Sequence, residues 1–320
     1  MSMKNAGLLF TLVGPAGVGK NQLMKHVMAH SPVTQLPTAT TRTIREGEQE
    51  GREHFYMSEE TFQQMIASDA LLEWQKVHRR YYGMVRTVVE AALDKGQPII
   101  ADIDIFGAIH IRERYPDKTV SVFIQPPSIG SLIDRMRTRG DRESEISKRL
   151  LRVPLELEHA QKCDYIVVND TFEHAADRLL EIVLSELQRQ SHRPAQVRVE
   201  LPLPYRYKAR VVPILGDQVL ACGGVFPTAI IGRDDQPADR ALAAIARELN
   251  VIPNSAQLLH GDKHDDGYVP PLSLDYVPTA DDEQIIYHYA YRLDASFTAP
   301  PGWSWSPLHM QPDLVRGLVG

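Results

Sequence analysis

Cysteine is scarce in this chain. Its 320 residues hold only two, Cys163 and Cys222, and these form no CxxC pair. Their spacing argues against a disulfide framework and a cysteine zinc site, and it fits a reducing compartment. No apolar run approaches the roughly 20 residues that cross a bilayer, and Met1–Gly7 is too short for a secretory signal. We therefore expect a cytoplasmic protein with no membrane partner.

An excess of positive charge is missing as well. The chain has 35 Lys and Arg against 41 Asp and Glu, a net charge of −6, and residues 201–320 alone hold 9 against 14. Proteins that bind duplex nucleic acid need a basic excess, so no nucleic-acid partner is expected. The 43% of hydrophobic and 24% of charged residues are values typical of a globular chain, and the length allows two domains.

Strand-like and helix-like segments alternate along the first 190 residues. Apolar runs predict buried strands at 8–13, 98–104, 119–125 and 165–168. Helical patterns lie at 21–30, 58–68, 128–138, 143–163 and 171–190. This alternation predicts an α/β fold with a parallel central sheet over residues 1–190.

The pattern changes after residue 190. Residues 191–204 hold three prolines and no helical period, which predicts a linker. A smaller α+β domain is then expected over 205–320. Its predicted elements are strands at 209–215, 219–222 and 284–293 and a helix at 237–249.

A glycine-rich turn directly follows the first predicted strand. The segment from Gly14 to Lys20 reads GPAGVGK and leads into a helix, which is the strand–GxxxxGK–helix order of a phosphate-binding P-loop. Its backbone N–H groups surround phosphate oxygens, and its lysine adds charge to the β- and γ-phosphates. A plain glycine turn is the alternative. The residues predicted to bind ATP here are Gly14, Ala16, Gly17, Val18, Gly19, Lys20 and Asn21.

The segments after this loop occur in a characteristic order. They are Thr40-Thr41-Arg42, Arg45-Glu46-Gly47-Glu48, Leu72-Glu73-Trp74, Tyr81-Tyr82-Gly83, Asp102-Ile103-Asp104 with Gly107, Pro126-Pro127-Ser128, Arg135–Gly140, Lys148-Arg149-Leu150 and Val168-Asn169-Asp170. In this order they resemble the TTRxxRxGE, LEW, YYG, DIDxxG, PPS, lid and VND segments of guanylate kinases. From Gly14 to about Leu187 the chain resembles that family.

The resemblance implies a P-loop nucleoside monophosphate kinase fold. It also implies an enzyme that transfers the γ-phosphoryl group of ATP to GMP or dGMP, with Mg²⁺ as cofactor. It implies GMP-binding roles for Thr38, Arg42, Arg45, His54, Glu73, Tyr82 and Asp104. It implies catalytic roles for Lys20, Arg42, Arg139 and Arg149. Arg135 and Asn169 are then expected to contact ATP, and Asn21 and Asp102 to hold the metal. The resemblance says nothing about the oligomeric state.

Three residues depart from the family pattern. Asn21 stands where the P-loop has Ser or Thr, although an amide oxygen can still ligate Mg²⁺. His54 stands where a tyrosine is usual, and Met84 stands where a hydroxyl follows YYG. Two alternatives therefore remain open. One is a ribose 1,5-bisphosphate phosphokinase on the same fold, and the other is a non-catalytic binding module.

The C-terminal half faintly resembles a degenerate Nudix domain. Arg247-Glu248-Leu249 resembles the REL core of a Nudix box, and Gly223-Gly224 lies upstream. Val251 and Ile252 stand where paired glutamates are expected, so a diphosphate-bound Mg²⁺ cluster and hydrolysis are not expected. A small α+β domain without Nudix ancestry is the alternative. The cluster His260–Asp266 is interpreted as a solvated loop rather than a cation site.

Overall fold

The computed structural model describes residues 7–45, 47–52, 54–77, 80–189, 205–232, 235–251, 256–259, 267–280 and 282–308. The predicted linker 191–204 and the cluster at 260–266 lie outside these ranges. The chain divides into two compact units. The first unit comprises Met1–Pro127 with Glu156–Glu200, and the second comprises Ser128–Leu155 with Leu201–Gly320.

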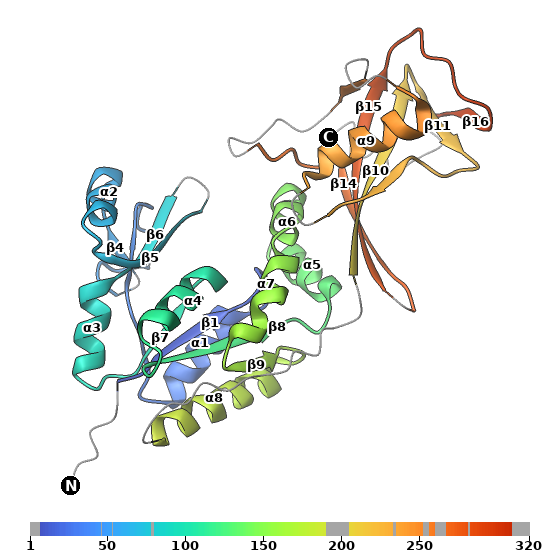
Figure 1. Cartoon of the computed structure of the whole chain (residues 1–320). Helices are drawn as coiled ribbons and strands as arrows, with labels where there is room; N and C mark the ends of the chain where they lie inside the picture. The colour runs from blue at the N-terminus through green and yellow to red at the C-terminus, as the bar shows by residue number, and fades with distance from the viewer. Residues whose placement is uncertain are drawn as a thin grey trace. The chain divides into compact units, whose positions relative to one another are not determined.

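A parallel sheet forms the centre of the first unit (Figure 1). Its strands lie in the order β2 (Thr34–Gln35), β7 (Ile99–Asp102), β1 (Leu9–Val13), β8 (Thr119–Gln125) and β9 (Tyr165–Val168). Every residue of β1 and β8 is buried, as expected for strands covered on both faces. The four strands predicted from apolar runs are confirmed. The two-residue β2, which is exposed and polar, was not predicted.

Helices cover both faces of this sheet. The described helices that lie wholly within the unit are α1 (Lys20–His30), α2 (Glu59–Ala67), α3 (Arg86–Asp94), α4 (Ile105–Arg114) and α8 (Phe172–Gln188). Figure 1 shows α4 on one face and α1 with α8 on the other. The side chains of Ser58, Asp104 and Thr171 cap α2, α4 and α8 by accepting a hydrogen bond from a first-turn N–H group.

A second sheet of four short strands lies in the segment between α1 and α3. Its order is β4 (His54–Tyr56), β3 (Thr38–Thr40), β6 (Arg80–Val85) and β5 (Leu71–Val77). Phe62 of α2 packs with Ala39, Leu71 and Tyr81 in its core. None of these four strands was predicted. β3 and β4 are only three residues long, and neither has a continuous apolar run.

The second unit begins with two helices, α5 (Ile129–Thr138) and α6 (Glu143–Leu150). The helix expected without interruption over 143–163 is in fact broken. α6 ends at Leu150, α7 (Val153–His159) follows, and a 3₁₀ turn η1 (Ala160–Lys162) completes the segment. Pro154 explains the break, because proline lacks an N–H and is tolerated only in a first helical turn. The division between the two units falls within α7.

A seven-stranded sheet forms the rest of the second unit. Two long parallel strands, β10 (Tyr205–Leu215) and β15 (Glu283–Leu293), pair at its centre (Figure 1). Around them lie β11 (Gln218–Cys222), β12 (Thr228–Ile230), β13 (Ala256–Leu258), β14 (Ser273–Pro278) and β16 (Trp303–Pro307). The helix α9 (Pro237–Leu249) packs on β10 and β12 and has the predicted bounds. The short strands β12, β13, β14 and β16 were not predicted.

Membrane-spanning helices and metal-binding clusters are both absent from the described ranges. None of their helices is long and apolar enough to cross a membrane. Within the same ranges, no three His, Cys, Asp or Glu side chains lie close enough together to hold a metal ion.

Asp164 is a fully buried charge that joins α4 to the central sheet. Its carboxylate accepts hydrogen bonds from Arg112 Nη2 at 2.6 Å and from the Ser121 backbone N–H at 2.8 Å. Asp164→Ala would leave both donors without this partner, so we expect the free energy of unfolding to fall by about 3 kcal/mol. Urea denaturation measures the effect. Glu113→Ala, an exposed acid on α4, is the matched control, and an equal effect of both variants would contradict the prediction.

Candidate active site

The P-loop leaves the carboxyl end of β1 through three glycines with positive φ. Gly14, Gly17 and Gly19 have φ of 140°, 83° and 100°. A Cβ on Gly14 would lie 2.3 Å from the carbonyl oxygen of Ile124, so β8 leaves no room for a side chain. Gly19 is the N-cap of α1. A glycine brings no side chain to cover the first N–H groups, and such a helix start binds anions.

Lys20 folds back over this loop. Its ammonium donates to the Gly14 carbonyl oxygen at 2.5 Å and lies 3.6 Å from Asp102 Oδ1. Asp102 ends β7, which is the neighbour of β1 in the sheet, so the parallel pairing brings acid and lysine together. Desolvation raises the pKa of Asp102, and Lys20 opposes that shift. Asn21, the other predicted metal ligand, is exposed in the first turn of α1. Both side chains offer the oxygen donors that Mg²⁺ prefers.

Asn169 supports the P-loop from the end of β9. Its side-chain amide donates to the Val18 carbonyl oxygen at 2.6 Å, and the residue is 5% exposed. A Cβ on Gly19 would meet Asn169 Nδ2 at 2.6 Å. The side chain therefore packs against the phosphate loop. Its contact with adenine remains a prediction.

Arg42 is held by Glu48 through a two-pronged ion pair. Its two terminal nitrogens donate to the two carboxylate oxygens at 2.9 and 2.7 Å. Glu48 also accepts from the Arg45 backbone N–H at 2.7 Å and from the Tyr56 hydroxyl at 2.8 Å. Arg42 lowers the pKa of Glu48 to about 2 and has its own pKa raised in return. The guanidinium is thus oriented in advance. The predicted partner Arg45 is exposed.

Glu48 and Tyr56 are additions to the predicted site. Glu48 belongs to the TTRxxRxGE segment, and that motif was the available signal for it. Tyr56 carried no such signal, because its contact with Glu48 depends on the pairing of β3 with β4.

Thr38 and His54 lie opposite each other on β3 and β4. His54 Nδ1 and the Thr38 hydroxyl are 2.7 Å apart. The His54 ring meets the rings of Tyr56 and Tyr82 edge to face, with centroids 5.6 and 6.0 Å away. When Nδ1 carries the proton, the imidazole donates to Thr38 and leaves the hydroxyl proton available for a ligand. Met84 is 1% exposed and belongs to the core, and its thioether has no proton to donate.

Glu73 and Asp104 are neighbouring acids from different elements. Glu73 lies on β5, and Asp104 caps the start of α4. Desolvation, followed by repulsion from Asp104, raises the pKa of Glu73 to about 8. Asp104 Oδ1 accepts from the Gly107 backbone N–H at 2.7 Å. A Cβ on Gly107 would lie 2.9 Å from Glu73 Oε2, so this glycine makes room for the carboxyl group. A dehydrated carboxyl group next to another acid is costly unless a ligand uses it.

The predicted lid arginines belong to the second unit. Asp141 brings two of them together, since it pairs with Arg139 and accepts from Arg149 at 2.5 Å. These arginines, Arg139 first, lower the pKa of Asp141. Arg135 lies on α5 and is partly buried. Asp141 was not predicted as a partner, although it lies within the lid segment.

Comparisons with known proteins place the chain in a family. The family model described as guanylate kinase matches residues 7–186. The curated guanylate kinase of Caldanaerobacter subterraneus is 39% identical over 188 residues, which cover 58% of this chain and 91% of the relative. The solved guanylate kinase of Anaplasma phagocytophilum is 28% identical, with a TM-score of 0.46 over 58% of this chain and 89% of that one. The chain belongs to the guanylate kinase family, as its segment order predicted.

That family consists of ATP-dependent phosphotransferases. The family match ends at residue 186, before the seven-stranded sheet begins with β10. A C. elegans Ap4A hydrolase structure aligns over 36% of this chain and 96% of that one. Its identity is 12% and its TM-score is 0.29. This likeness is too distant to assign the C-terminal region to a family.

The raised pKa of Glu73 has a consequence for stability. It lies well above the value of about 4.3 for an unfolded glutamate, so the folded state binds the proton more tightly. The resulting stabilisation is complete below about pH 4.3 and is lost as the pH rises towards 8. Glu73→Gln removes this dependence. Between about pH 5 and pH 8.5, we expect the wild type to lose roughly 2 kcal/mol relative to the variant. Urea unfolding at both pH values measures this, and a pH-independent difference would contradict it.

Proposed function

We propose that this member of the guanylate kinase family transfers the γ-phosphoryl group of ATP to GMP and dGMP, with Glu73 reading the guanine base. The observation that carries the proposal is the desolvated Glu73 beside Asp104 and Gly107. Its carboxylate accepts from two neighbouring donors, and guanine offers such a pair in its N1–H and exocyclic amine. Adenine lacks that pair of donors at the same positions. Hydrogen bonds from guanine would replace the hydrogen bonds to water that the buried Glu73 carboxyl group lacks.

The Thr38–His54 pair supports the same recognition. With His54 donating to Thr38 Oγ1, the threonine hydroxyl donates to the guanine carbonyl oxygen. Histidine in place of tyrosine thus keeps a polar group at this position. It acts on the base through Thr38.

The acceptor phosphate is assigned to Arg42, Arg45 and Tyr82. A guanidinium fork binds phosphate through two parallel hydrogen bonds, and Glu48 already holds Arg42 in one orientation. Tyr82 contributes its hydroxyl from β6. Its register partner on β3 is Thr40, two residues before Arg42.

The donor triphosphate is assigned to the P-loop backbone and Lys20, with Mg²⁺ held through Asp102 and Asn21. Asp102 and Asn21 offer only a few oxygen ligands. This suits Mg²⁺, which usually keeps several water ligands and binds the phosphates of its nucleotide. Magnesium bound there would neutralise negative charge on the phosphates of ATP. Lys20 turns from the Gly14 carbonyl to the phosphates, and Asp102 limits its movement through their ion pair.

The transfer itself needs positioning and positive charge, and no covalent intermediate on the protein. Charge spreads over the equatorial oxygens of the moving phosphoryl group, and cations that converge on it lower the barrier. We assign this role to Arg135, Arg139 and Arg149 together with Lys20 and Arg42. Asp141, which pairs with Arg139 and Arg149, keeps them close together until phosphate oxygens replace it.

For the C-terminal domain we keep a Nudix-like fold without hydrolytic activity as a proposal. The helix α9 carries Arg247 and Glu248 between β12 and β13. Val251 offers no carboxylate for a metal cluster. A cytoplasmic location with free nucleotides as partners completes the proposed function.

An acceptor panel tests the assignment. With ATP and Mg²⁺ we expect turnover of GMP and dGMP and none of AMP, UMP or ribose 1,5-bisphosphate in a coupled assay. Glu73→Gln should lower kcat/KM for GMP by roughly 100-fold, because the amide cannot accept both guanine donors. Glu59→Gln, an exposed acid on α2, is the control. Turnover of the sugar phosphate alone would favour the phosphokinase alternative, and nucleotide binding without turnover would favour a binding module.

Gly107→Ala tests the geometry around Glu73. The added methyl group would lie 2.9 Å from Glu73 Oε2 and displace the carboxyl group. Since alanine favours a helix more than glycine does, α4 itself is not weakened. We expect KM for GMP to rise about tenfold or more while KM for ATP stays unchanged. Steady-state kinetics with each substrate varied measure this.

Lys20→Ala gives the opposite pattern. It should lower kcat by about 100-fold or more and leave GMP affinity, measured by calorimetry, within about twofold of wild type. Equal effects of both variants on GMP binding would contradict the separate assignment of acceptor and donor sites.

A further inference from the structure

The lid segment, defined here as Ile129–Leu150 with its helices α5 and α6, lies in the same compact unit as the C-terminal sheet. Its contacts with that sheet are made by buried hydrogen bonds at defined helix ends. They join residues between 57 and 154 positions apart in the chain. They are therefore a product of the appended domain, which lies outside the residues matched to the family.

Tyrosine hydroxyls bind the carboxyl end of α6. Tyr287 of β15 donates to the Ser147 carbonyl oxygen at 2.9 Å, and Tyr207 of β10 donates to the Leu150 carbonyl oxygen at 2.9 Å. Tyr268 donates to Ser147 Oγ at 2.6 Å. The last four carbonyl groups of a helix have no partner within it, and the sheet supplies two of these partners here. All three tyrosines are less than 10% exposed.

The amino end of α5 is bound in a complementary way. Glu283 of β15 accepts from the Ile129 backbone N–H at 3.2 Å, and its other carboxylate oxygen accepts from the Tyr276 hydroxyl at 2.5 Å. A carboxylate is favoured at this end of a helix, where the N–H groups carry partial positive charge. A Cβ on Gly130 would lie 2.5 Å from the Tyr276 ring, so the helix needs glycine at this point.

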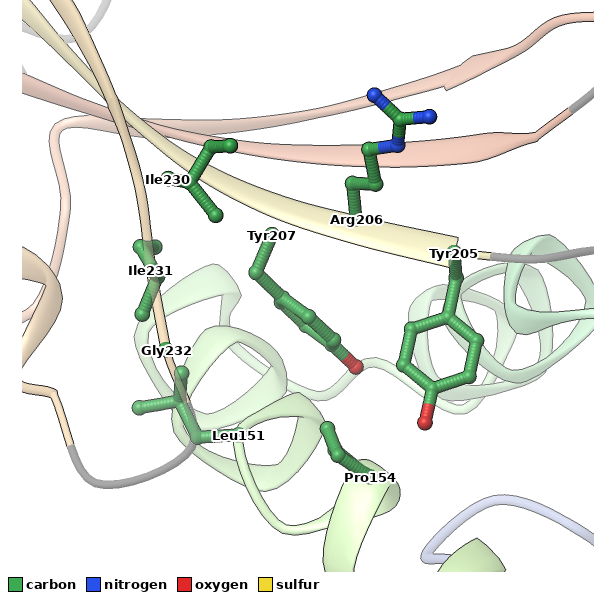
Figure 2. Close-up of a pocket in the computed structure, with 8 residues that line it drawn as sticks. All are labelled: Leu151, Pro154, Tyr205, Arg206, Tyr207, Ile230, Ile231 and Gly232. Carbon is green, nitrogen blue, oxygen red and sulfur yellow. The ribbon is translucent and has the colours of Figure 1, made fainter.

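Figure 2 shows how Tyr207 reaches the lid segment. A cavity of about 230 Å³ lies between Leu151 and Pro154 on one side and the strands β10 and β12 on the other. Tyr207 lines this cavity and points towards the turn after α6. Its hydroxyl therefore joins the strand to the end of α6 beside a space that the side chains do not fill.

We propose that the C-terminal sheet positions the lid arginines, with Tyr207, Tyr268, Tyr287 and Glu283 as positioning residues. Arg149 lies between Ser147 and Leu150, the two residues whose carbonyl groups the tyrosines bind. Arg135 follows on the helix whose start Glu283 binds. The sheet thus fixes the backbone from which these arginines extend. This inference rests on the proposed function only where it concerns catalysis.

A set of matched tyrosine variants tests the proposal. Tyr287, Tyr289 and Tyr291 occupy every second position of β15 and are all buried, and Tyr287 donates to the lid segment. Tyr289 donates to the Val269 carbonyl oxygen at 3.0 Å. Tyr289→Phe is therefore the control for Tyr287→Phe, because both remove one buried hydroxyl from the same strand.

We expect Tyr287→Phe to lower kcat roughly tenfold and to leave KM for GMP within about twofold of wild type. Tyr289→Phe should lower the melting temperature to a similar extent and leave kcat unchanged. A Tyr287→Phe enzyme that is destabilised and keeps its kcat would overturn the proposal, because its hydroxyl would then be only structural.

Native-state hydrogen exchange on the unaltered protein needs no variant and no turnover. We expect the amides of α6 to exchange through the same opening as those of β15, with equal free energies of opening over a series of urea concentrations. Independent opening of α6 at much lower cost would overturn the proposal. A wild-type protein that turns over none of the acceptors would contradict the proposed function alone, since this exchange measurement does not depend on it.

Discussion

The parallel pairing of β1 with β7 and β8 is the constraint on which the proposed donor site depends. Because parallel strands end at the same edge of a sheet, the loop after β1 meets Asp102 from β7 and the end of β8 without any connection between them in sequence. Gly14 is required because the Ile124 carbonyl approaches so closely. Lys20 is restrained by Asp102, and Asn169 from β9 supports the loop. Each contact follows from strand order, so a change in the sheet would disturb all of them together.

Two glutamates of the first unit, Glu48 and Glu73, have opposite pKa shifts because their surroundings differ. Glu48 faces a guanidinium, a hydroxyl and a backbone N–H, and its pKa falls to about 2. It is therefore a permanent anion that orients Arg42. Glu73 faces Asp104 in a dehydrated position, and its pKa rises to about 8. It retains its proton easily until a ligand with hydrogen-bond donors arrives. The first acid builds the site, and the second is available to read a ligand.

Much of the fold could be predicted from the sequence wherever a short stretch of residues carries its own pattern. The strands 119–125 and 165–168 and the helix 237–249 have the expected bounds, because a continuous apolar run or a regular helical period marks each one. The short strands β3 and β4 carry no such pattern, and only their pairing with β6 stabilises them. Glu73 and Asp104 were found through their motifs. Tyr56 and Asp141 were not, because their roles depend on partners that only the fold brings near. The tyrosine contacts of the lid segment join residues 57 and 140 positions apart, and they could not be predicted for the same reason.

The parallel pairing of β10 with β15 has a consequence for synthesis. The two strands are separated by the whole stretch that holds β11, β12, α9, β13 and β14, so their contacts form late and over a long loop. A ribosome that releases the chain from its amino end exposes α6 long before Tyr287 is made. Until then, the Ser147 carbonyl group lacks the Tyr287 hydroxyl that binds it in the folded chain. The contact between α6 and β15 can therefore form only after the last long strand has emerged.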